Sequence, residues 1–439
     1  MKKTSRGILK TKKERSKNAL HLTKKIIYKP TEQELNILNA FAFSSAKLWN
    51  IANYEKKNYI ELGFSSFPNW YDQKKRLKDE FWYKNLPSQT AQDVLDKLQK
   101  SWKSFFELQK SKGIKNPKPP RFKEKNSLFN FTFLNNGFNK ISKDTINFSI
   151  PKQQKEYLED NFSFDSKYLS LKIKEFSAVT EKIKTIEFKP LKDKTYQINV
   201  VYEIEEAQLN KDNKHYLSID IGIKNLFTCY DNEGKSFIAS GTKYLEISHY
   251  FNKKIAHFQS IASKQQIASG KKYASTTKRI KNLQNKKRLQ LHHFFHCATK
   301  EIASYCEKND ISKAVIGDIK NIRKNSNLGK VTNQKLHALP YEKLYSYLQY
   351  KLRTKGIELI KIKEIYSSQV SPFAPKVNKT YATKAKRKHR GLFIDNHVKF
   401  NADSVGAYNI LRLYEEKQNK GLLMPIKGLS SPIRIKVAV

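Results

Sequence analysis

The stretch YLSIDIGI, residues 216–223, combines an apolar strand pattern with a single carboxylate, that of Asp220. Similar segments follow along the chain: FTCYD (227–231), KSFIAS (235–240), AVIGDI (314–319) and IELIKIKEI (357–365). Helical patterns lie between the later segments, and strands interleaved with helices are typical of an α/β layer. We therefore expect residues 211–370 to form most of an α/β domain.

The N-terminal half begins with a basic arm and continues in a helical pattern. Residues 1–30 combine the arm with a short strand that ends at Pro30. Apolar residues at helical spacing follow, and they predict a helical unit over residues 31–125. Thr31 and Glu34 form a capping box at the start of this unit.

A second helix of this unit is expected between Ser88, as its cap, and Gly113. The segment NPKPPRFKE, residues 116–124, is typical of an extended, proline-stiffened loop. Short alternating runs between residues 126 and 210 then predict a small antiparallel sheet or barrel. The expected fold class is therefore multi-domain α+β, in which the helical and β-rich parts precede the α/β domain.

The charge balance indicates the class of partner. The 439 residues include 85 Lys and Arg against 40 Asp and Glu, a formal net charge of +45. Self-repulsion on this scale disfavours a compact state unless a polyanion neutralises it, so we expect nucleic acid as the partner. A ribosome-associated basic protein or a membrane-surface binder is the alternative, but 23 Tyr and 26 Phe supply surfaces on which bases can stack.

Other classes of protein are disfavoured by the composition. No apolar run reaches the roughly 18 residues that span a bilayer, so we expect no membrane partner. Cys229, Cys297 and Cys306 form no CxxC pair, which supports neither a disulfide framework nor a cysteine zinc site. We therefore expect a protein of the reducing cytoplasm.

Two segments are basic and contain no acidic residue. Residues 247–300 contain twelve Lys and Arg, and we expect one long helix that lies along a phosphate backbone, the alternative being a plain exposed face. Residues 376–390, KVNKTYATKAKRKHR, have the composition of a loop that is disordered until it meets nucleic acid. The candidate nucleic-acid-binding residues here are Lys278, Arg279, Lys287, Arg288, Lys386, Arg387, Lys388 and Arg390.

Three carboxylates are associated with apolar segments. Asp220 lies inside a strand, Glu364 closes another strand, and Asp403 lies in the first turn of a helix. Each one alone is more often a turn residue or a helix cap. Together they fit a site for hard divalent cations, and two such ions about 4 Å apart can cleave a phosphodiester by in-line displacement. No cysteine or histidine cluster offers a competing metal site, and Ser-His-Asp or Cys-His catalysis is unsupported.

The order and spacing of several stretches resemble the TnpB family, which comprises RNA-guided nucleases of insertion sequences related to the ancestors of type V CRISPR effectors. The stretches are SIDIGIKN (218–225), AVIGDI (314–319), LPYEKLYSYLQYKLRTKGIEL (339–359), KEIYSSQ (363–369), FNADSVGAYNI (400–410), AKLWNIAN (46–53) and NPKPPRFK (116–123). Each stretch alone is a weak signal, but their order is specific and covers nearly the whole chain.

The resemblance implies a wedge β-barrel interrupted by a helical recognition unit, followed by a RuvC nuclease of the RNase H-like fold. The expected segments are 1–30 (basic arm and first wedge strand), 31–125 (recognition unit), 126–210 (wedge barrel), 211–370 (first RuvC part), 371–399 (basic insert that binds target nucleic acid), 400–416 (final RuvC helix) and 417–439 (basic tail).

The resemblance also implies a function. A guide RNA from the transposon end would direct the chain to double-stranded DNA beside a short target-adjacent motif, where one RuvC site would cut with Mg²⁺, as two ions. Asp220 matches the first RuvC aspartate and Asp403 the last, and we expect both, with Glu364, to be catalytic metal ligands. Candidate contacts near the motif are Asn50, Tyr54, Gln73, Lys74, Lys118, Arg121 and Lys123. We expect a bacterial protein that associates with the nucleoid when bound to DNA.

Two departures from the family pattern affect these expectations. Most members have a glutamate where this chain has Gly317, but some have it downstream, and Glu364 lies 46 residues after Asp318. Strand alternation sends residues 317 and 318 to opposite faces, so we keep Asp318 only as a reserve ligand. Members usually carry two CxxC pairs, whereas the regions here read SPFAP (371–375) and GLFIDNH (391–397), so we expect no zinc.

Three alternatives to a guided nuclease are open. Some TnpB-like proteins resemble nuclease-inactive, RNA-guided DNA-binding repressors; the intact acids argue against this reading and the missing cysteines argue for it. A DNA-strand transposase would need a tyrosine nucleophile with paired histidines, and we find no such motif. A guide-independent RNase H-like DNA nuclease, such as a junction resolvase, gives the large N-terminal half no evident role.

Overall fold

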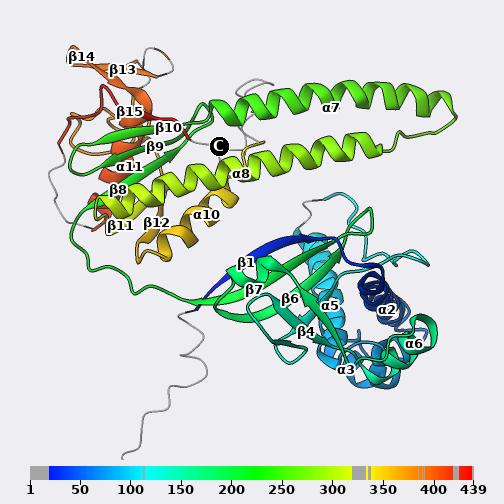
Figure 1. Ribbon diagram of the computed structural model, residues 1–439. Helices are drawn as coiled ribbons and strands as arrows, with labels where there is room; N and C mark the ends of the chain where they lie inside the picture. The colour runs from blue at the N-terminus through cyan, green and yellow to red at the C-terminus, as the bar shows by residue number, and fades with distance from the viewer. Residues whose placement is uncertain are drawn as a thin grey trace, which may run out of the picture. The chain divides into compact units, whose positions relative to one another are not determined.

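The computed structural model forms two compact units, Met1–Glu205 and Glu206–Val439 (Figure 1). It describes residues 19–111, 114–318, 333–334, 338–383, 385–387, 389, 391–418 and 425–437. The mixed α and β, multi-domain character expected from the sequence is confirmed. Residues 1–18 of the expected basic arm, and Gly113, lie outside the described residues, whereas the strand β1 already begins at Ala19.

The N-terminal unit is built on two antiparallel sheets. The larger has the strand order β1 (Ala19–Tyr28), β7 (Tyr196–Glu205), β6 (Lys182–Pro190) and β2 (Phe131–Leu134). The smaller contains β3 (Phe138–Lys140), β4 (Thr145–Ser149) and β5 (Tyr168–Lys172). Because β1 pairs with β7 from Ala19↔Glu205 to Tyr28↔Tyr196, the first and last strands of this unit are neighbours. Buried phenylalanines such as Phe133, Phe148 and Phe188 fill the core between the elements.

Helices occupy the sequence between β1 and β2. They are α2 (Glu32–Lys57), α3 (Trp70–Arg76), the 3₁₀ turn η1 (Leu77–Asp79), α4 (Phe81–Lys84) and α5 (Ser88–Ser111). The capping box of Thr31 and Glu34 is confirmed, because each side chain accepts the backbone N–H of the other. Ser88, which we expected to cap α5, is instead its first residue.

One helix in the β-rich region was not expected. The structure has α6 (Lys152–Phe162) between β4 and β5, and a 3₁₀ turn η2 (Lys174–Ala178) after β5. Only Gln154 and Leu158 of α6 are buried, so its sequence, KQQKEYLEDNF, carries almost no apolar periodicity. The expectation of an all-β segment from 126 to 210 was therefore wrong at this point.

The C-terminal unit contains a six-stranded mixed sheet. Its order is β12 (Glu358–Ile362), β11 (Lys313–Gly317), β8 (Tyr216–Ile221), β9 (Asn225–Asp231), β10 (Ser236–Ser240) and β15 (Ile433–Ile435). The strands β8, β9 and β10 are antiparallel neighbours, whereas β11 is parallel to β8, β12 to β11 and β15 to β10.

Helices cover both faces of this sheet. Helices α8 (Lys278–Lys308) and α10 (Tyr341–Arg353) pack on the face that carries Leu217 and Ile219. Helix α11 (Ala402–Gln418) packs on the opposite face, which carries Tyr216. The expectation of an α/β layer is met by this arrangement.

The basic region 247–300 is not one long helix. It forms α7 (Thr242–Ala268) and α8, two long helices that lie side by side (Figure 1), joined through residues 269–277. Gly270, with a φ of +81°, stands just after α7 and permits the turn. None of the described helices combines the length and the apolar character that crossing a membrane requires.

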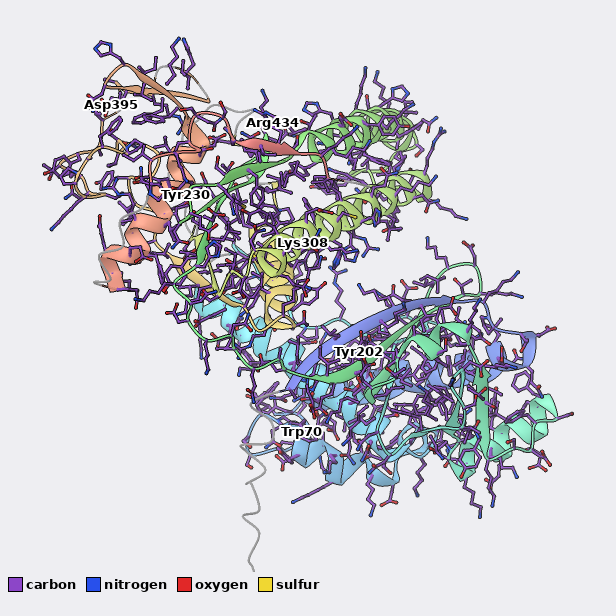
Figure 2. The ribbon with its side chains drawn as sticks, turned by 60° about the vertical axis from the view of Figure 1, so that its left-hand side comes forward. Trp70, Tyr202, Tyr230, Lys308, Asp395 and Arg434 are labelled. Atoms are coloured by element: carbon purple, nitrogen blue, oxygen red, sulfur yellow. The ribbon has the colours of Figure 1, made fainter. Side chains whose placement is uncertain are left out.

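The predicted basic insert is ordered where the structure describes it, in contrast to the disordered loop that its composition predicted. It ends in the hairpin of β13 (Leu392–Asp395) and β14 (Val398–Asn401). Asp395, labelled in Figure 2, is buried there and accepts hydrogen bonds from Ser371 and from Lys386, the latter at 2.8 Å. The carbonyl of Lys386 also accepts the N–H of Ile394. Asp395 thus ties the start of the insert, at Ser371, and its basic segment, at Lys386, to the hairpin, and no cysteine takes part.

Candidate metal centre and nucleic-acid surfaces

Asp220 faces helix α11 from the central strand β8. Alternation along β8 places Asp220 on the same face as Tyr216, which packs against α11. The backbone of α11 approaches closely at Gly406, where a Cβ atom would lie 2.8 Å from Asp220 Oδ2. Gly406 therefore leaves the space that the carboxylate of Asp220 occupies.

Glu364 lies over the end of β11. Gly317 is the last residue of β11 and pairs with Ile362 of β12, two residues before Glu364. A Cβ atom on Gly317 would lie 1.9 Å from Glu364 Oε2 and 3.1 Å from Ile410 Cδ1 of α11. The carboxylate of Glu364 therefore fills the space that a side chain at residue 317 would take, on the face that Asp220 shares.

Asp403 is held in the first turn of α11. The side chain of Asn401 caps this helix by accepting the N–H groups of Asp403 and Ser404, both at 3.1 Å. Asn225 Nδ2 donates to Asp403 Oδ2 at 2.7 Å, and Arg387 Nη2 donates to Oδ1 at 3.4 Å. Asp403 is thus oriented from two sides before any ligand arrives.

The carboxylates act on one another through their charges. Burial, together with the nearby charge of Asp403, raises the pKa of Asp220 to about 7, although Arg387 opposes the shift. Burial, Asp220 and Asp318 raise the pKa of Glu364 to about 8. Four carboxylates, one on β8, one on α11 and two that follow β11 and β12, therefore form a single electrostatic site. Cations would relieve the repulsion, and carboxylate oxygens are the ligands that Mg²⁺ prefers.

The spacing of this group differs from that of a single-ion cage. Among the residues that the structure describes, only His215, Asp231 and Glu233 have ligand atoms that all lie within 4.8 Å of one another. Asp220, Glu364 and Asp403 are therefore spread more widely.

The trio of His215, Asp231 and Glu233 corrects the expectation that no histidine cluster exists. His215 precedes β8, so the trio lies at the end of the strand away from Asp220. The oxygens of Asp231 already accept the N–H groups of Glu233 and Lys235 and the hydroxyl of Tyr305. These contacts close the turn between β9 and β10, which is a structural role.

A cavity of about 460 Å³ adjoins Asp403. Its lining includes three basic residues, Lys224, Arg387 and Arg434, and the last of these is labelled on β15 in Figure 2. Guanidinium groups bind phosphate oxygens with two parallel hydrogen bonds. The cavity can therefore accept a backbone phosphate next to the carboxylates.

The turn that carries Glu364 is anchored to α11. Tyr366 in this turn has a φ of 64°, a conformation that residues with side chains rarely adopt. Asn409 of α11 is fully buried and donates to the carbonyls of Ser367 (2.8 Å) and Val370 (2.7 Å). Asn409 therefore holds the strained turn in place.

Sequence reasoning did not single out four residues that shape this site: Asn225, Asn401, Gly406 and Asn409. All four lie in the stretches SIDIGIKN and FNADSVGAYNI, so a signal was present. It was not used because only carboxylates were sought as ligands.

In the N-terminal unit, the proline-rich loop lies along α2. Asn50 donates to the carbonyl of Lys123 and accepts its N–H, so its amide fixes the loop and is not free to contact bases. Lys118 and Arg121 are exposed, whereas Lys123 lies between the rings of Trp49 and Phe129, at 4.4 and 4.0 Å from their centroids. A cavity of about 730 Å³ beside this loop combines these cations with aromatic side chains.

Gln73 does not lie at the surface. Its side chain is fully buried and donates to the carbonyl of Ala52 and to Glu55, so the expectation that it contacts nucleic acid is corrected. Tyr54 is 52% exposed, and Lys74 lies over the ring of Trp70, labelled in Figure 2. These two side chains stay available for contact.

The basic candidates of the C-terminal unit differ in exposure. Lys278, Arg279 and Arg288 are exposed on α8, whereas Lys287 is partly buried and donates to Asn252 of α7. Lys386 and Arg387 are bound to Asp395 and Asp403. Lys388 and Arg390 lie outside the described residues.

Two family models and one viral protein match the sequence of this chain. The family OrfB_IS605, described as a probable transposase, matches residues 199–323, and the TNB domain of Cas12f1-like proteins matches residues 341–410. The TnpB-like protein ORF457 of Acidianus two-tailed virus is 23% identical over 416 residues, which cover 85% of this chain and 82% of the viral protein. These matches support a protein of the TnpB family. The first family match spans Asp220 and Gly317, and the second spans Glu364 and Asp403.

A solved structure shares the fold of this chain. It is the protein of a Cas12f1-sgRNA-target DNA complex, which aligns with a TM-score of 0.59 over 87% of this chain and 83% of its own. The two sequences are only 18% identical, so the likeness concerns the fold.

Proposed function

We propose that this TnpB-family chain is an RNA-guided, Mg²⁺-dependent DNA endonuclease encoded by a transposon, which cuts target DNA next to a short target-adjacent motif. One observation carries the proposal. Asp220, Glu364 and Asp403 converge on the α11 face of a sheet in which three antiparallel strands are followed by two parallel ones. That strand order supports an RNase H-like RuvC domain.

Each residue of the site has a role in this proposal. Asp220, Glu364 and Asp403 would hold Mg²⁺, with Asp318 in reserve, because all four offer carboxylate oxygens. When bound, Mg²⁺ supplies Lewis acidity and an activated water for in-line displacement. Asn225 fixes the rotamer of Asp403 through its hydrogen bond at 2.7 Å.

The basic residues beside Asp403 would handle the substrate. Arg387 donates to Asp403 at 3.4 Å and lines the adjoining cavity, so it can turn to an incoming phosphate without leaving the site. Lys224 and Arg434 line the same cavity and add positive charge. Together they would draw the DNA backbone towards the carboxylates.

Two observations support guide RNA and target DNA as partners: the positive charge of the chain and its structural similarity to a Cas12f1 protein. The net charge of +45 favours a large polyanion as partner, and α7 and α8 present exposed Lys and Arg along two helices. The Cas12f1 relative was solved with sgRNA and target DNA. In such complexes base pairing reads the sequence, while the protein reads the adjacent motif and the shape of the heteroduplex. We assign these tasks to the N-terminal unit, as recognition unit and wedge, and to the insert 371–399.

No zinc is required for the insert in this proposal. Residues 371–399 contain no cysteine, so the pattern of family members with CxxC pairs does not fit here. The hydrogen bonds of Asp395 with Ser371 and Lys386 would take over the task of holding the loop.

The test is to express the chain together with the RNA that flanks its gene, to sequence any RNA that co-purifies, and to assay cleavage of a DNA library with randomised motifs. We expect RNA-dependent and Mg²⁺-dependent cleavage that Asp220→Asn and Glu364→Gln abolish while DNA binding persists. The control Glu246→Gln removes an exposed carboxylate of α7 and should leave cleavage unchanged.

The outcomes separate the alternatives. RNA-dependent binding without cleavage would identify a repressor, the reading that the missing cysteines favour. Cleavage in the absence of RNA would identify a guide-independent nuclease. If no RNA co-purifies and none restores activity, the guided function is wrong.

A further inference from the structure

The N-terminal unit contains a cavity of about 470 Å³ between α2, α4 and α6, apart from every residue assigned above. Its volume lies within the range of small-molecule sites, roughly 300 to 1,000 Å³. Five aromatic side chains form much of its wall: Phe43, Phe81, Trp82, Tyr157 and Phe162. No charged side chain lines it in the part of the chain that the structure describes.

Three of these aromatic side chains, Phe81, Tyr157 and Phe162, are exposed to solvent, whereas Phe43 and Trp82 are partly buried. Phe81 is 55% exposed and Tyr157 is 48% exposed, and both lie at the same cavity. Trp82 meets Phe43 and Phe81 edge to face, with centroids 5.4 and 4.9 Å apart. Lys47 Nζ already lies over the ring of Phe43, at 4.7 Å from its centroid, so the exposed rings of Phe81 and Tyr157 are the ones on which a flat π system can stack.

Gln154 supplies an independent sign of a missing ligand. Its side chain lines the cavity and is only 1% exposed, yet its Oε1 has no hydrogen-bond partner among the described residues. Buried acceptors are almost always satisfied, so this atom calls for a donor that the chain does not supply, either a water or a ligand group. The residue stands on α6, where the preceding residue, Gln153, donates to Asn85 and to the carbonyl of Phe81.

Further amides line the same cavity. Asn39 accepts the hydroxyl of Tyr196 through Oδ1, which leaves its amino group as the polar group to face a ligand. Asn36 and Asn85 add two more amides to the lining. The cavity therefore offers both donors and acceptors between aromatic walls.

We propose that this cavity holds one unstacked nucleobase of the RNA that the protein binds. A base is flat and neutral, and its edge carries the donors and acceptors that the amides require. A phosphate does not fit uncharged walls. Lys84 at the end of α4, and Lys152 and Lys155 in the first turn of α6, can contact the RNA backbone outside the cavity, Lys84 and Lys152 by exchanging surface ion pairs with Asp79 and Glu156.

RNA is the favoured source because its loops and bulges present unstacked bases, whereas bases of duplex DNA stay stacked. The proposal rests on the proposed function, since it requires a bound RNA. Stacking of one base on aromatic side chains changes affinity by about 5- to 150-fold when the rings are removed.

The first experiment locates the base. The complex with its co-purified RNA is irradiated with ultraviolet light, digested and analysed by mass spectrometry. We expect a cross-link from one nucleotide to the peptide of Phe81 and Trp82 or to that of Tyr157. The absence of cross-links to these peptides, in a complex that cross-links elsewhere, would overturn the proposal.

The second experiment measures the contact. A synthetic copy of the RNA carries an abasic site at the cross-linked nucleotide, and its affinity is compared with that of the intact RNA. We expect at least a fivefold loss for the wild-type protein and no further loss for the double variant Phe81→Ala/Tyr157→Ala, because both changes remove the same contact. Equal abasic penalties for variant and wild type would overturn the proposal.

Two further variants test whether the effect comes from the cavity itself and not from misfolding or from the loss of any exposed aromatic side chain. Gln154→Leu keeps the volume and removes the unpaired oxygen, so it should fold normally and weaken RNA binding. Tyr168→Ala removes a ring of the same unit that is 49% exposed and does not line the cavity, and it should bind RNA like the wild type.

The remaining outcomes are distinct. If the cavity variants lose affinity for target DNA but not for RNA, the occupant is a DNA base and the assignment to RNA is wrong. If guided cleavage occurs and all cavity variants bind RNA normally, this inference fails while the proposed function stands. If the chain binds no RNA, both fail.

Discussion

The substitution Gly317→Ala tests the position of Glu364 most directly. The added Cβ atom would lie 1.9 Å from Glu364 Oε2, whereas ordinary contacts begin at 3.4 Å. The carboxylate must therefore move by about 1.5 Å. The new methyl group cannot itself shift far, because Ile410 Cδ1 would lie only 3.1 Å from it on the other side.

The size of the effect follows from this displacement. A misplacement of about 1 Å in a catalytic group can lower a rate by about 100-fold. We therefore expect Gly317→Ala to slow DNA cleavage at least about 100-fold under single-turnover conditions, close to the effect of Glu364→Gln. DNA binding should change little, because neither residue lies in the cavity that adjoins Asp403.

The assay compares cleavage of end-labelled target DNA with its binding in gel-shift experiments. Lys363→Ala, a change in an exposed neighbour of Glu364, is the control and should cleave normally. The double variant Gly317→Glu/Glu364→Ser moves the carboxylate onto β11 and should recover part of the activity. Cleavage by Gly317→Ala at the wild-type rate would refute the assignment of Glu364.

Three more predictions concern stability and metal binding. Without Mg²⁺, the melting temperature should fall as pH rises from about 4 to 8, because folded Asp220 and Glu364, whose pKa values are raised to about 7 and 8, keep protons that the unfolded chain releases. Added Mg²⁺ should therefore raise the melting temperature more at pH 8.5 than at pH 6. An equal increase in the melting temperature at both pH values would contradict the assignment of Asp220 and Glu364 as its ligands. Asn409→Ala should lower the free energy of unfolding in urea by about 1 to 3 kcal/mol and slow cleavage more than binding, since two buried carbonyls lose their donor. Asp395→Ala should lower that free energy by a similar ~1 to 3 kcal/mol because Lys386 loses its partner, whereas a zinc chelator should leave the melting temperature of the wild type unchanged.

The positions of Asp220 and Asp403 followed from local rules. Period-two alternation fixed the face of β8, and the first turn of an apolar helix fixed Asp403. The capping box at Thr31 was equally local. Local rules work here because burial on one face leaves a strand or helix only one orientation.

The parts that sequence reasoning missed depend on distant contacts. Gln73 looks like a surface residue in a polar helix, but α2 covers it and provides its partners. Helix α6 gains its stability from two buried residues, too few for a periodic signal. The insert is ordered through Asp395, which lies 24 residues from Ser371 in the chain. No window along the sequence contains these partners together.

The pairing of β1 with β7 has a consequence for synthesis. Ala19 leaves the ribosome first, but its partner Glu205 follows 186 residues later. At about 5 to 20 residues per second, β1 waits roughly 10 to 40 s as an unpaired strand, while the helices encoded in between can already form. Lys24 and Lys25 near its middle would discourage premature pairing with neighbouring chains during that interval.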